Sequence, residues 1–440
     1  MVLTTTPPPP KSGQVTTGPP VSPAKARLGW LDALRGIAAL TVMVSHYIEF
    51  MLPQAWTVLG RYFVPGTFGV LLFFMVSGYI IPASLERRGS VRGFWLSRLF
   101  RLYPLTLVSI GLGLLFVGLG WQTRSLAAIT PALAQHPTTT VLANATMLQD
   151  LLGGANMVPV MWTLSYEMVF YCLVSALFAA GLHRRSGQIS LGFAGLALLS
   201  LAVVPPLCFS TSYPGSRVAI LVSFGVFVVG IGCMVSRRVP RAVGAVLVGG
   251  LVLTLVVLNG RLAPWYSMVI LATMFSGTAL YRAEQGQVSR RVTAALCIPV
   301  VLISVAIGTR YGGDRSGAVS ATVSWPWVFG ILAVWGLFTA GMLLRNRAMP
   351  GPLSWLGRIS FSVYMLHVVM LSAVLWLMRR LHVVPLHLQL WEQLLWLLGP
   401  CAVVLAVSQL TYQYVEMPMQ RLGRRVSERA DRRWGSDVRP

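Results

Sequence analysis

The sequence predicts an all-α polytopic membrane protein with about 10–12 transmembrane helices. Of its 440 residues, 55% are hydrophobic and only 11% are charged, whereas a soluble domain carries about a quarter of charged residues. The mean hydropathy of +0.70 comes from repeated apolar runs, many near the roughly 20 residues that a membrane-spanning helix needs. These values exclude a soluble enzyme, a fibrous protein and a disordered chain.

The first 27 residues differ in composition from the rest of the chain. They hold the run Pro7–Pro10, the pair Pro19-Pro20 and scattered Ser, Thr and Gly. Such a segment cannot bury an apolar core, so residues 1–27 are predicted to be a disordered, Pro-rich cytoplasmic tail. The segment lacks the pattern of a secretory signal, so the first hydrophobic helix is expected to insert the protein.

Twelve segments after this tail have the composition of a spanning helix, within a membrane domain expected over residues 28–420. Very short turns such as 259–261 leave ten or eleven spans as alternatives. The segments are 30–52, 67–85, 102–120, 160–181, 191–209, 217–235, 241–259, 263–281, 292–309, 325–344, 360–378 and 392–414. The external loop 121–159 is a candidate for a re-entrant or interfacial piece.

The distribution of Lys and Arg predicts the orientation. With the N-terminus in the cytoplasm, 26 of the 35 basic residues fall in loops and tails on that side, among them the basic tail 421–440. Because cytoplasmic loops are rich in Lys and Arg, both termini are expected in the cytoplasm and the protein in the inner (cytoplasmic) membrane. The net charge of +23 then reports topology, and the expected partner is the lipid bilayer, with no nucleic acid.

The chain shows no pattern of a metal site. Its five cysteines lie in or beside apolar spans without CxxC or Cys/His spacing, so neither a disulfide framework nor a metal or bound cofactor is predicted. Two halves related by an internal repeat are not evident, which weakens the case for a transporter built from repeats.

The first span carries four ionisable residues, Asp32, Arg35, His46 and Glu49, each costly inside a bilayer. Arg35 and His46 are eleven residues apart, about 20° past three full turns, so they share one helix face at an axial distance of roughly 16 Å. Asp32 lies three residues before Arg35 and can pair with it. A neutral His46 would suit a general base, and a helix–helix hydrogen bond of a buried imidazole is the alternative.

Arg98 and Arg101 lie three residues apart on one helix face at the cytoplasmic boundary. Such a pair suits a phosphate or carboxylate, although snorkelling anchors are the commoner use of arginines there. In the second span Ser77 and Gly78 fit close helix packing.

Later spans add four candidate site residues. Glu167 is a buried-looking acid that would pair with an intramembrane Arg or His, or serve packing alone. Tyr364 and His367 lie one turn apart, and Glu416 ends the last span, where a simple ion pair with a nearby arginine is the alternative.

Six segments together resemble the membrane-embedded acyltransferase-3 family and occur in that family's order from about residue 28 to 425. They are Leu34–Ala39 with His46, Phe73–Gly78, Arg98–Arg101, Trp162–Glu167 with Phe170-Tyr171, Ile359–His367, and Glu416–Pro418. One departure is the Leu71-Leu72 pair, where family members often have an acid. The short segment after Glu416 leads us to expect the stand-alone form, without the SGNH domain of some relatives.

The resemblance implies an O-acyltransferase that moves an acyl group, often acetyl, from acyl-CoA as co-substrate to a hydroxyl. The acceptor would be a sugar of a glycan, a glycolipid or a glycosylated secondary metabolite such as a macrolide. His46 would take the proton of the acceptor hydroxyl, with Glu167 or Asp32 orienting the site, and a covalent acyl-histidine is a variant. The arginines expected to hold the CoA phosphates are Arg35, Arg98 and Arg101. Further residues expected around the site are Ser77, Tyr364, His367 and Glu416.

Two other function classes fit the same features. A membrane transporter or flippase would use Arg35, His46 and Glu167 for ion coupling, and a non-catalytic scaffold would use them for packing.

Overall fold

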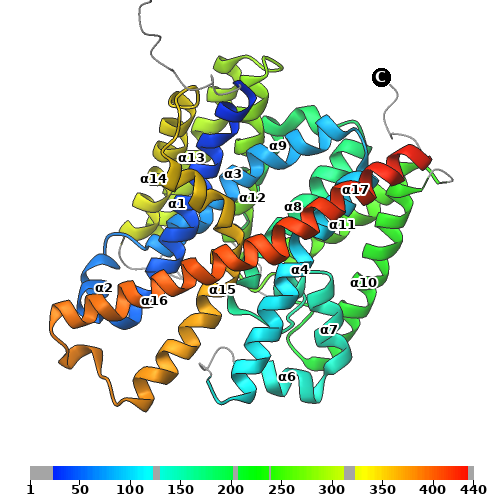
Figure 1. The fold of residues 1–440 in the computed structure, drawn as a ribbon. Helices are drawn as coiled ribbons and strands as arrows, with labels where there is room; N and C mark the ends of the chain where they lie inside the picture. The colour runs from blue at the N-terminus through cyan, green and yellow to red at the C-terminus, as the bar shows by residue number, and fades with distance from the viewer. Residues whose placement is uncertain (1–22, 122–128, 202–206, 237–238, 312–322, 435–440) are drawn as a thin grey trace, which may run out of the picture.

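The protein is a helical bundle (Figure 1). Two helix crossings at glycines and one buried helix determine which side chains meet. A computed structural model describes residues 23–121, 129–201, 207–236, 239–311 and 323–434, and these contain helices and no strand. The α-helices are α1 (Pro23–Met51), α2 (Pro53–Leu59), α3 (Pro65–Arg88), α4 (Val91–Gly118), α6 (Ile129–Gln135), α7 (Pro137–Ala145), α8 (Trp162–Ala179), α9 (Ser186–Ser200), α10 (Tyr213–Val235), α11 (Arg241–Leu258), α12 (Pro264–Glu284), α13 (Arg290–Tyr311), α14 (Trp325–Leu343), α15 (Gly351–Arg380), α16 (Leu390–Thr411) and α17 (Met417–Trp434). Short 3₁₀ turns are η1 (Gln149–Leu151), η2 (Pro159–Met161), η3 (His183–Arg185) and η4 (Pro385–His387), and η5 (Tyr412–Glu416) is a π-helical segment.

Ten helices in these ranges are long and apolar enough to cross a membrane. This confirms the predicted all-α membrane fold with 10–12 spans, whereas the side on which the termini lie stays a prediction. The two other predicted spans, 191–209 and 263–281, overlap α9, which has 15 residues, and α12, which has 21. Of the predicted N-terminal tail, residues 1–22 lie outside the described residues, and α1 begins at Pro23.

The α12 helix is the centre of the bundle, and its burial explains its polar sequence. Every residue from Pro264 to Ala279 is buried, so this helix faces other helices rather than lipid. Buried hydroxyls therefore find partners: Ser190 of α9 donates to the carbonyl oxygen of Ala272 at 2.7 Å, and Thr278 donates to the carbonyl oxygen of Gly78 at 2.7 Å. In lipid there is no hydrophobic driving force for helices to associate, so interhelical hydrogen bonds of this kind help to hold them together.

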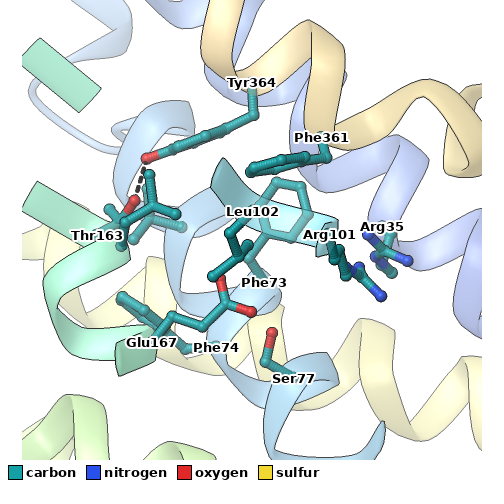
Figure 2. A pocket seen from close by; sticks show the side chains of 12 residues that line it. Arg35, Phe73, Phe74, Ser77, Arg101, Leu102, Thr163, Glu167, Phe361 and Tyr364 are labelled. Carbon is teal, nitrogen blue, oxygen red and sulfur yellow. Dashed lines mark hydrogen bonds between the residues drawn. The ribbon is translucent and has the colours of Figure 1, made fainter. Parts of the chain in front are cut away.

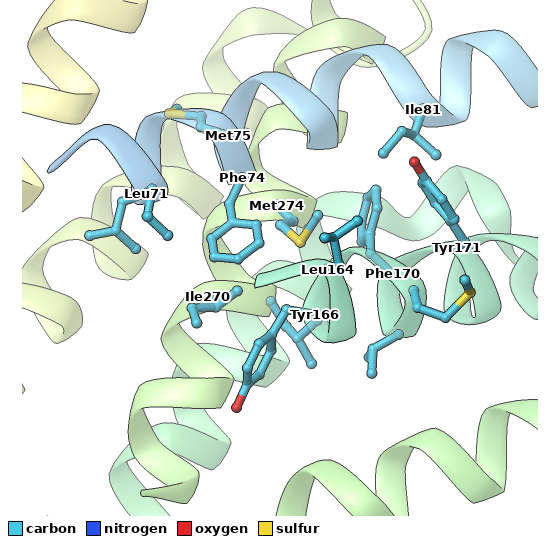
Figure 3. Close-up of a cluster of buried hydrophobic side chains, with 14 of the residues drawn as sticks. Leu71, Phe74, Met75, Ile81, Leu164, Tyr166, Phe170, Tyr171, Ile270 and Met274 are labelled. Atoms are coloured by element: carbon cyan, nitrogen blue, oxygen red, sulfur yellow. The ribbon is translucent and has the colours of Figure 1, made fainter. Parts of the chain in front are cut away.

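Glycines allow α3 and α12 to cross backbone against backbone. A Cβ on Gly78 would overlap the backbone of Met274, and one on Gly277 would overlap the carbonyl oxygen of Met75. Figure 3 shows the apolar side chains of α3, α8 and α12 that fill the space around this crossing. Leu71 and Leu72 are both fully buried and pack in this apolar cluster.

A second glycine crossing joins α1 to α15. A Cβ on Gly36 would lie 2.8 Å from the backbone nitrogen of Gly357, and a Cβ on Gly357 would overlap the backbone of Asp32. This contact brings the charged end of the first span against α15, which carries Tyr364 and His367.

The chain ends in a long oblique helix that crosses the front of the bundle, drawn from orange to red in Figure 1. The π-helical η5 interrupts it between α16 and α17. The predicted basic tail is thus helical as far as Trp434, and its Gly423 and Ser427 are buried, with Gly423 facing Phe100 of α4.

The long loop predicted to hold a re-entrant or interfacial piece folds into α6, α7, η1 and η2 over its described part. Gln149 and Asp150 of η1 are buried. The Asn144 amide donates to the carbonyl oxygens of Thr140 and Ala155 at 2.9 Å each, so polar side chains hold this segment on the bundle.

Candidate active site

A cavity, called the central cavity below, lies between α1, α3, α4, α8 and α15, with an empty volume of about 580 Å³ that includes its open side. Figure 2 shows arginines at one end, Tyr364 and Thr163 at the other, and Glu167 with Ser77 between them. The lining residues are Arg35, Val70, Phe73, Phe74, Ser77, Arg101, Leu102, Thr163, Leu164, Glu167, Phe361 and Tyr364.

Arg35 and Arg101 form the cationic end of this cavity. Asp32 interacts electrostatically with both arginines, and so does Glu416. Because unpaired charge inside a bundle is costly, these carboxylates make the arginine pair tolerable. Two guanidinium groups at the rim of a cavity suit an anionic ligand.

The π-helical segment η5 presents Glu416 to this cluster. The Glu416 carboxylate is 4% exposed and accepts hydrogen bonds from the Ser362 hydroxyl and the Gln420 amide, each at 3.0 Å. Single-turn π segments are frequent at functional sites. Here the segment sets a buried acid beside the arginine pair.

Glu167 lies on α8 with Thr163 one helical turn before it and its hydrogen-bond partner Tyr171 one turn after it. The Tyr171 hydroxyl donates to Glu167 Oε1 in a short hydrogen bond. Arg98 stacks on the ring of Tyr171, with its Cζ atom 5.3 Å from the ring centroid. Arg98 is buried and does not line the cavity, but it interacts electrostatically with Arg101 and Glu167 of the lining.

Tyr364 and Phe73 form the wall opposite the arginines. The Tyr364 and Thr163 hydroxyls are 2.7 Å apart, and the rings of Tyr364 and Phe73 meet edge to face with centroids 5.6 Å apart. A cavity wall of apolar side chains with a few hydroxyl groups suits an uncharged, extended ligand that carries few polar groups.

Two histidines lie behind this wall. The ring centroids of Tyr364 and His367 are 5.8 Å apart, and those of His367 and His46 are 5.1 Å apart. His367 is fully buried, and within the described ranges its Nε2 has no hydrogen-bond partner. His46 is partly exposed, and its Nδ1 lies 2.9 Å from the carbonyl oxygen of Val42. A neutral ring that donates to this carbonyl carries its lone pair on Nε2.

The predicted site residues thus fall into three groups. Lining the cavity are Arg35, Ser77, Arg101, Glu167 and Tyr364; interacting with its cationic end are Asp32 and Glu416; behind its lining are Arg98, His46 and His367. Sequence reasoning missed Thr163 and Tyr171 as site residues, although their spacing of four residues on either side of Glu167 was the available signal. No group of three His, Cys, Asp or Glu side chains arranged to hold a metal is found in the described part of the chain.

A family model and one curated relative identify the chain as similar to acyltransferases. A family model described as an acyltransferase domain matches residues 28–413. The chain is 29% identical over 153 residues to an acyltransferase, MdmB, from Streptomyces mycarofaciens, covering 34% of this chain and 38% of that protein. It is 26% identical over 181 residues to nodulation protein 10 from Rhizobium leguminosarum bv. viciae, covering 38% and 48%. The chain thus spans less than half the length of either relative, and no solved structure matches it.

Proposed function

Because the chain belongs to the acyltransferase-3 family, whose model covers residues 28–413, we propose that this membrane acyltransferase moves an acetyl group from acetyl-CoA to a sugar hydroxyl. The acceptor is a glycan, a glycolipid or a glycosylated secondary metabolite. The observation that carries the proposal is the central cavity, which has two arginines at one end and the histidine pair behind the other.

The donor occupies the cavity with its diphosphate at Arg35 and Arg101. Charge-assisted bonds from guanidinium groups are the usual protein contacts of phosphate. The pantetheine arm has 13 bonds between phosphorus and sulfur, which at three bonds per ~3.5 Å extends about 15 Å. Arg35 and His46 are separated by a comparable axial distance of roughly 16 Å on α1, so the thioester reaches the Tyr364 end.

His46 acts as the general base for the acceptor. Its Nε2 takes the proton of the acceptor hydroxyl, the hydroxyl oxygen bonds to the thioester carbonyl carbon, and the carbon–sulfur bond then breaks. The proton passes to the departing thiolate, which leaves as the thiol of CoA. His46 is partly exposed and does not line the cavity, which supports an acceptor that reaches this base from outside the donor cavity.

Other side chains position these groups. Glu167, held by Tyr171, points into the cavity and orients the thioester-bearing arm, and Arg98 supports Tyr171 by stacking. Asp32 and Glu416 orient the arginine pair with which they interact. His367 lies between His46 and Tyr364 and holds the base in place.

The test is acetyl transfer by the purified full chain in proteoliposomes. Radiolabelled acetyl-CoA is supplied together with extracted glycans and small glycosides from a strain that lacks the gene, and mass spectrometry looks for an acetyl mass increment. CoA release with an acetylated product supports the proposal. Transport of a solute without CoA release would instead favour the transporter reading of Arg35, His46 and Glu167.

A further inference from the structure

A second pocket opens between the end of α3 and α17, on the side where Arg101 and Glu416 lie. It is lined by Ser84, Arg87, Arg88, Arg424, Ser427, Glu428 and Asp431, and we call it the outer pocket. None of these residues was a candidate of the sequence analysis, and none lines the central cavity.

Two side chains of the outer pocket, Arg88 and Asp431, are held in place by contacts within the protein. Arg88 donates to the carbonyl oxygen of Gly93 at 2.6 Å and to the Ser427 hydroxyl at 2.9 Å. Asp431 accepts from the Ser90 hydroxyl at 2.9 Å and lies 3.7 Å from Arg92. These bonds use the side chains of Arg88 and Asp431 within the protein.

The side chains left at the mouth are exposed and mainly cationic. Arg87 and Arg424 are exposed, as is Glu428. With Asp431 paired to Arg92, the three arginines of the pocket outweigh the one remaining carboxylate. This balance favours a phosphate, which binds arginine guanidinium groups well.

Helix geometry connects the outer pocket to the central cavity. On α3, Ser77 lines the cavity, whereas Ser84 and Arg88 line the outer pocket. Steps of seven and eleven residues return to within about 20° of the same face. The axial distance from Ser77 to Ser84 is thus about 10.5 Å at 1.5 Å per residue.

The facing helices repeat this pattern at intervals of four residues, which also stay close to one helix face. Glu416, Gln420 and Arg424 lead outward from the arginine pair, and the Gln420 amide donates to Glu416 Oε1 at 3.0 Å. On α4, Arg101 and Gly93 lie eight residues apart, an axial distance of about 12 Å, and the Gly93 carbonyl oxygen accepts from Arg88. Residues of the same three helices thus lie at or beside both pockets.

We propose that the outer pocket binds the ribose 3′-phosphate of the acyl-CoA donor, with Arg87 and Arg424 as the contacting cations. This inference rests on the proposed function, in which the diphosphate lies at Arg35 and Arg101. In CoA, six to eight bonds separate the diphosphate phosphorus atoms from the 3′-phosphate, which extends about 7–10 Å. That span is comparable to the axial distance of about 10.5 Å between Ser77 of the cavity lining and Ser84 of the outer pocket. The outer pocket thus distinguishes CoA from thioester donors without this phosphate.

The test compares binding of CoA and 3′-dephospho-CoA to the full chain in phosphatidylcholine nanodiscs. The wild type is expected to bind CoA about tenfold or more tightly than 3′-dephospho-CoA, as one charge-assisted phosphate contact allows. Arg87→Ala and Arg424→Ala should each shrink this ratio and leave the affinity for 3′-dephospho-CoA unchanged. Arg425→Ala is the matched control, because Arg425 is exposed and lies outside the outer pocket.

Several outcomes would overturn the inference. If the wild type binds both ligands equally well, the assignment of the outer pocket is wrong and the proposed donor stands. If the wild type binds neither ligand, the proposed donor is wrong as well. Equal weakening of both ligands in the Arg87 and Arg424 variants, or the same effect from Arg425→Ala, would assign these arginines to general charge. A lipid headgroup would also supply a phosphate, so the variants are also prepared with added phosphatidylglycerol. If they lose retention of phosphatidylglycerol and keep the CoA ratio, the occupant is lipid and the inference is wrong.

Discussion

The imidazole rings of His46 and His367 lie with their centroids 5.1 Å apart, although one comes from the first span and the other from α15. Each ring is anchored to the backbone of its own helix, because Nδ1 of His46 lies 2.9 Å from the carbonyl oxygen of Val42 and Nδ1 of His367 lies 3.1 Å from that of Val363. Both Nε2 atoms then carry a lone pair. His367 of this pair lies beside Tyr364, which lines the cavity.

His367→Gln tests whether the buried ring positions His46. We expect kcat to fall about 10- to 100-fold, within the range of acid–base contributions, with the KM for acetyl-CoA unchanged. Tyr47→Phe is the control, since its hydroxyl donates to the His367 carbonyl oxygen at 3.2 Å and leaves the ring untouched. A raised KM for acetyl-CoA with normal kcat would place His367 in donor binding instead.

Tyr171→Phe tests the support of Glu167. The change removes the hydroxyl that donates to Glu167 and keeps the aromatic face under Arg98. We expect kcat to fall about tenfold, since a hydrogen bond to a charged group is worth roughly 1.5–3 kcal/mol. Tyr166→Phe on the same helix removes a hydroxyl that lies 2.7 Å from that of Ser267 and lies outside the cavity lining. Equal losses of activity in both variants would show that general packing of α8, not Glu167, is responsible.

Gly78→Ala tests the crossing of α3 and α12. Because a Cβ on Gly78 would overlap the Met274 backbone, the helices must separate, and overpacking costs roughly 1–3 kcal/mol or more. We expect a clearly lower melting temperature in detergent. Gly111→Ala is the control, since nothing lies within 4 Å of its Cβ position. Equal melting temperatures for the two variants would contradict the described crossing.

Arg282→Ala tests a buried ion pair away from the cavity. Arg282 is 1% exposed and bonds Glu86 at 2.5 Å, Gln287 at 2.7 Å and Ser186 at 2.9 Å. Removing one partner of a buried pair costs about 3–5 kcal/mol, so we expect strong thermal destabilisation. The double variant Arg282→Met with Glu86→Leu should recover much of the loss. If Arg282→Ala melts like the wild type, the pair does not stabilise the fold.

Composition and charge placement were sufficient to predict the helical membrane fold, because lipid imposes length and hydropathy on each span. They also marked Arg35, His46 and Glu167 as ionisable side chains inside predicted spans, where each needs a reason. Which spans are neighbours could not be predicted, since a helical pattern gives the polar face of each helix and not the helix opposite it. The meeting of His46 with His367 is one such case.

Two further features have local causes that sequence patterns do not reveal. The π-helical turn that buries Glu416 depends on packing of the last helix against α4 and α15. The central position of α12 depends on glycine contacts with α3. From the sequence alone, its polar residues make it look like a weakly hydrophobic span, and only its burial in the bundle explains them.

The most direct test of the proposed mechanism is the acetyl-transfer rate of His46→Gln in proteoliposomes, measured beside its affinity for CoA. A general base contributes about 10²- to 10⁴-fold, so we predict a loss of kcat in that range with insertion, folding and CoA binding like those of the wild type. A His46→Gln variant that transfers acetyl groups at the wild-type rate would contradict the mechanism.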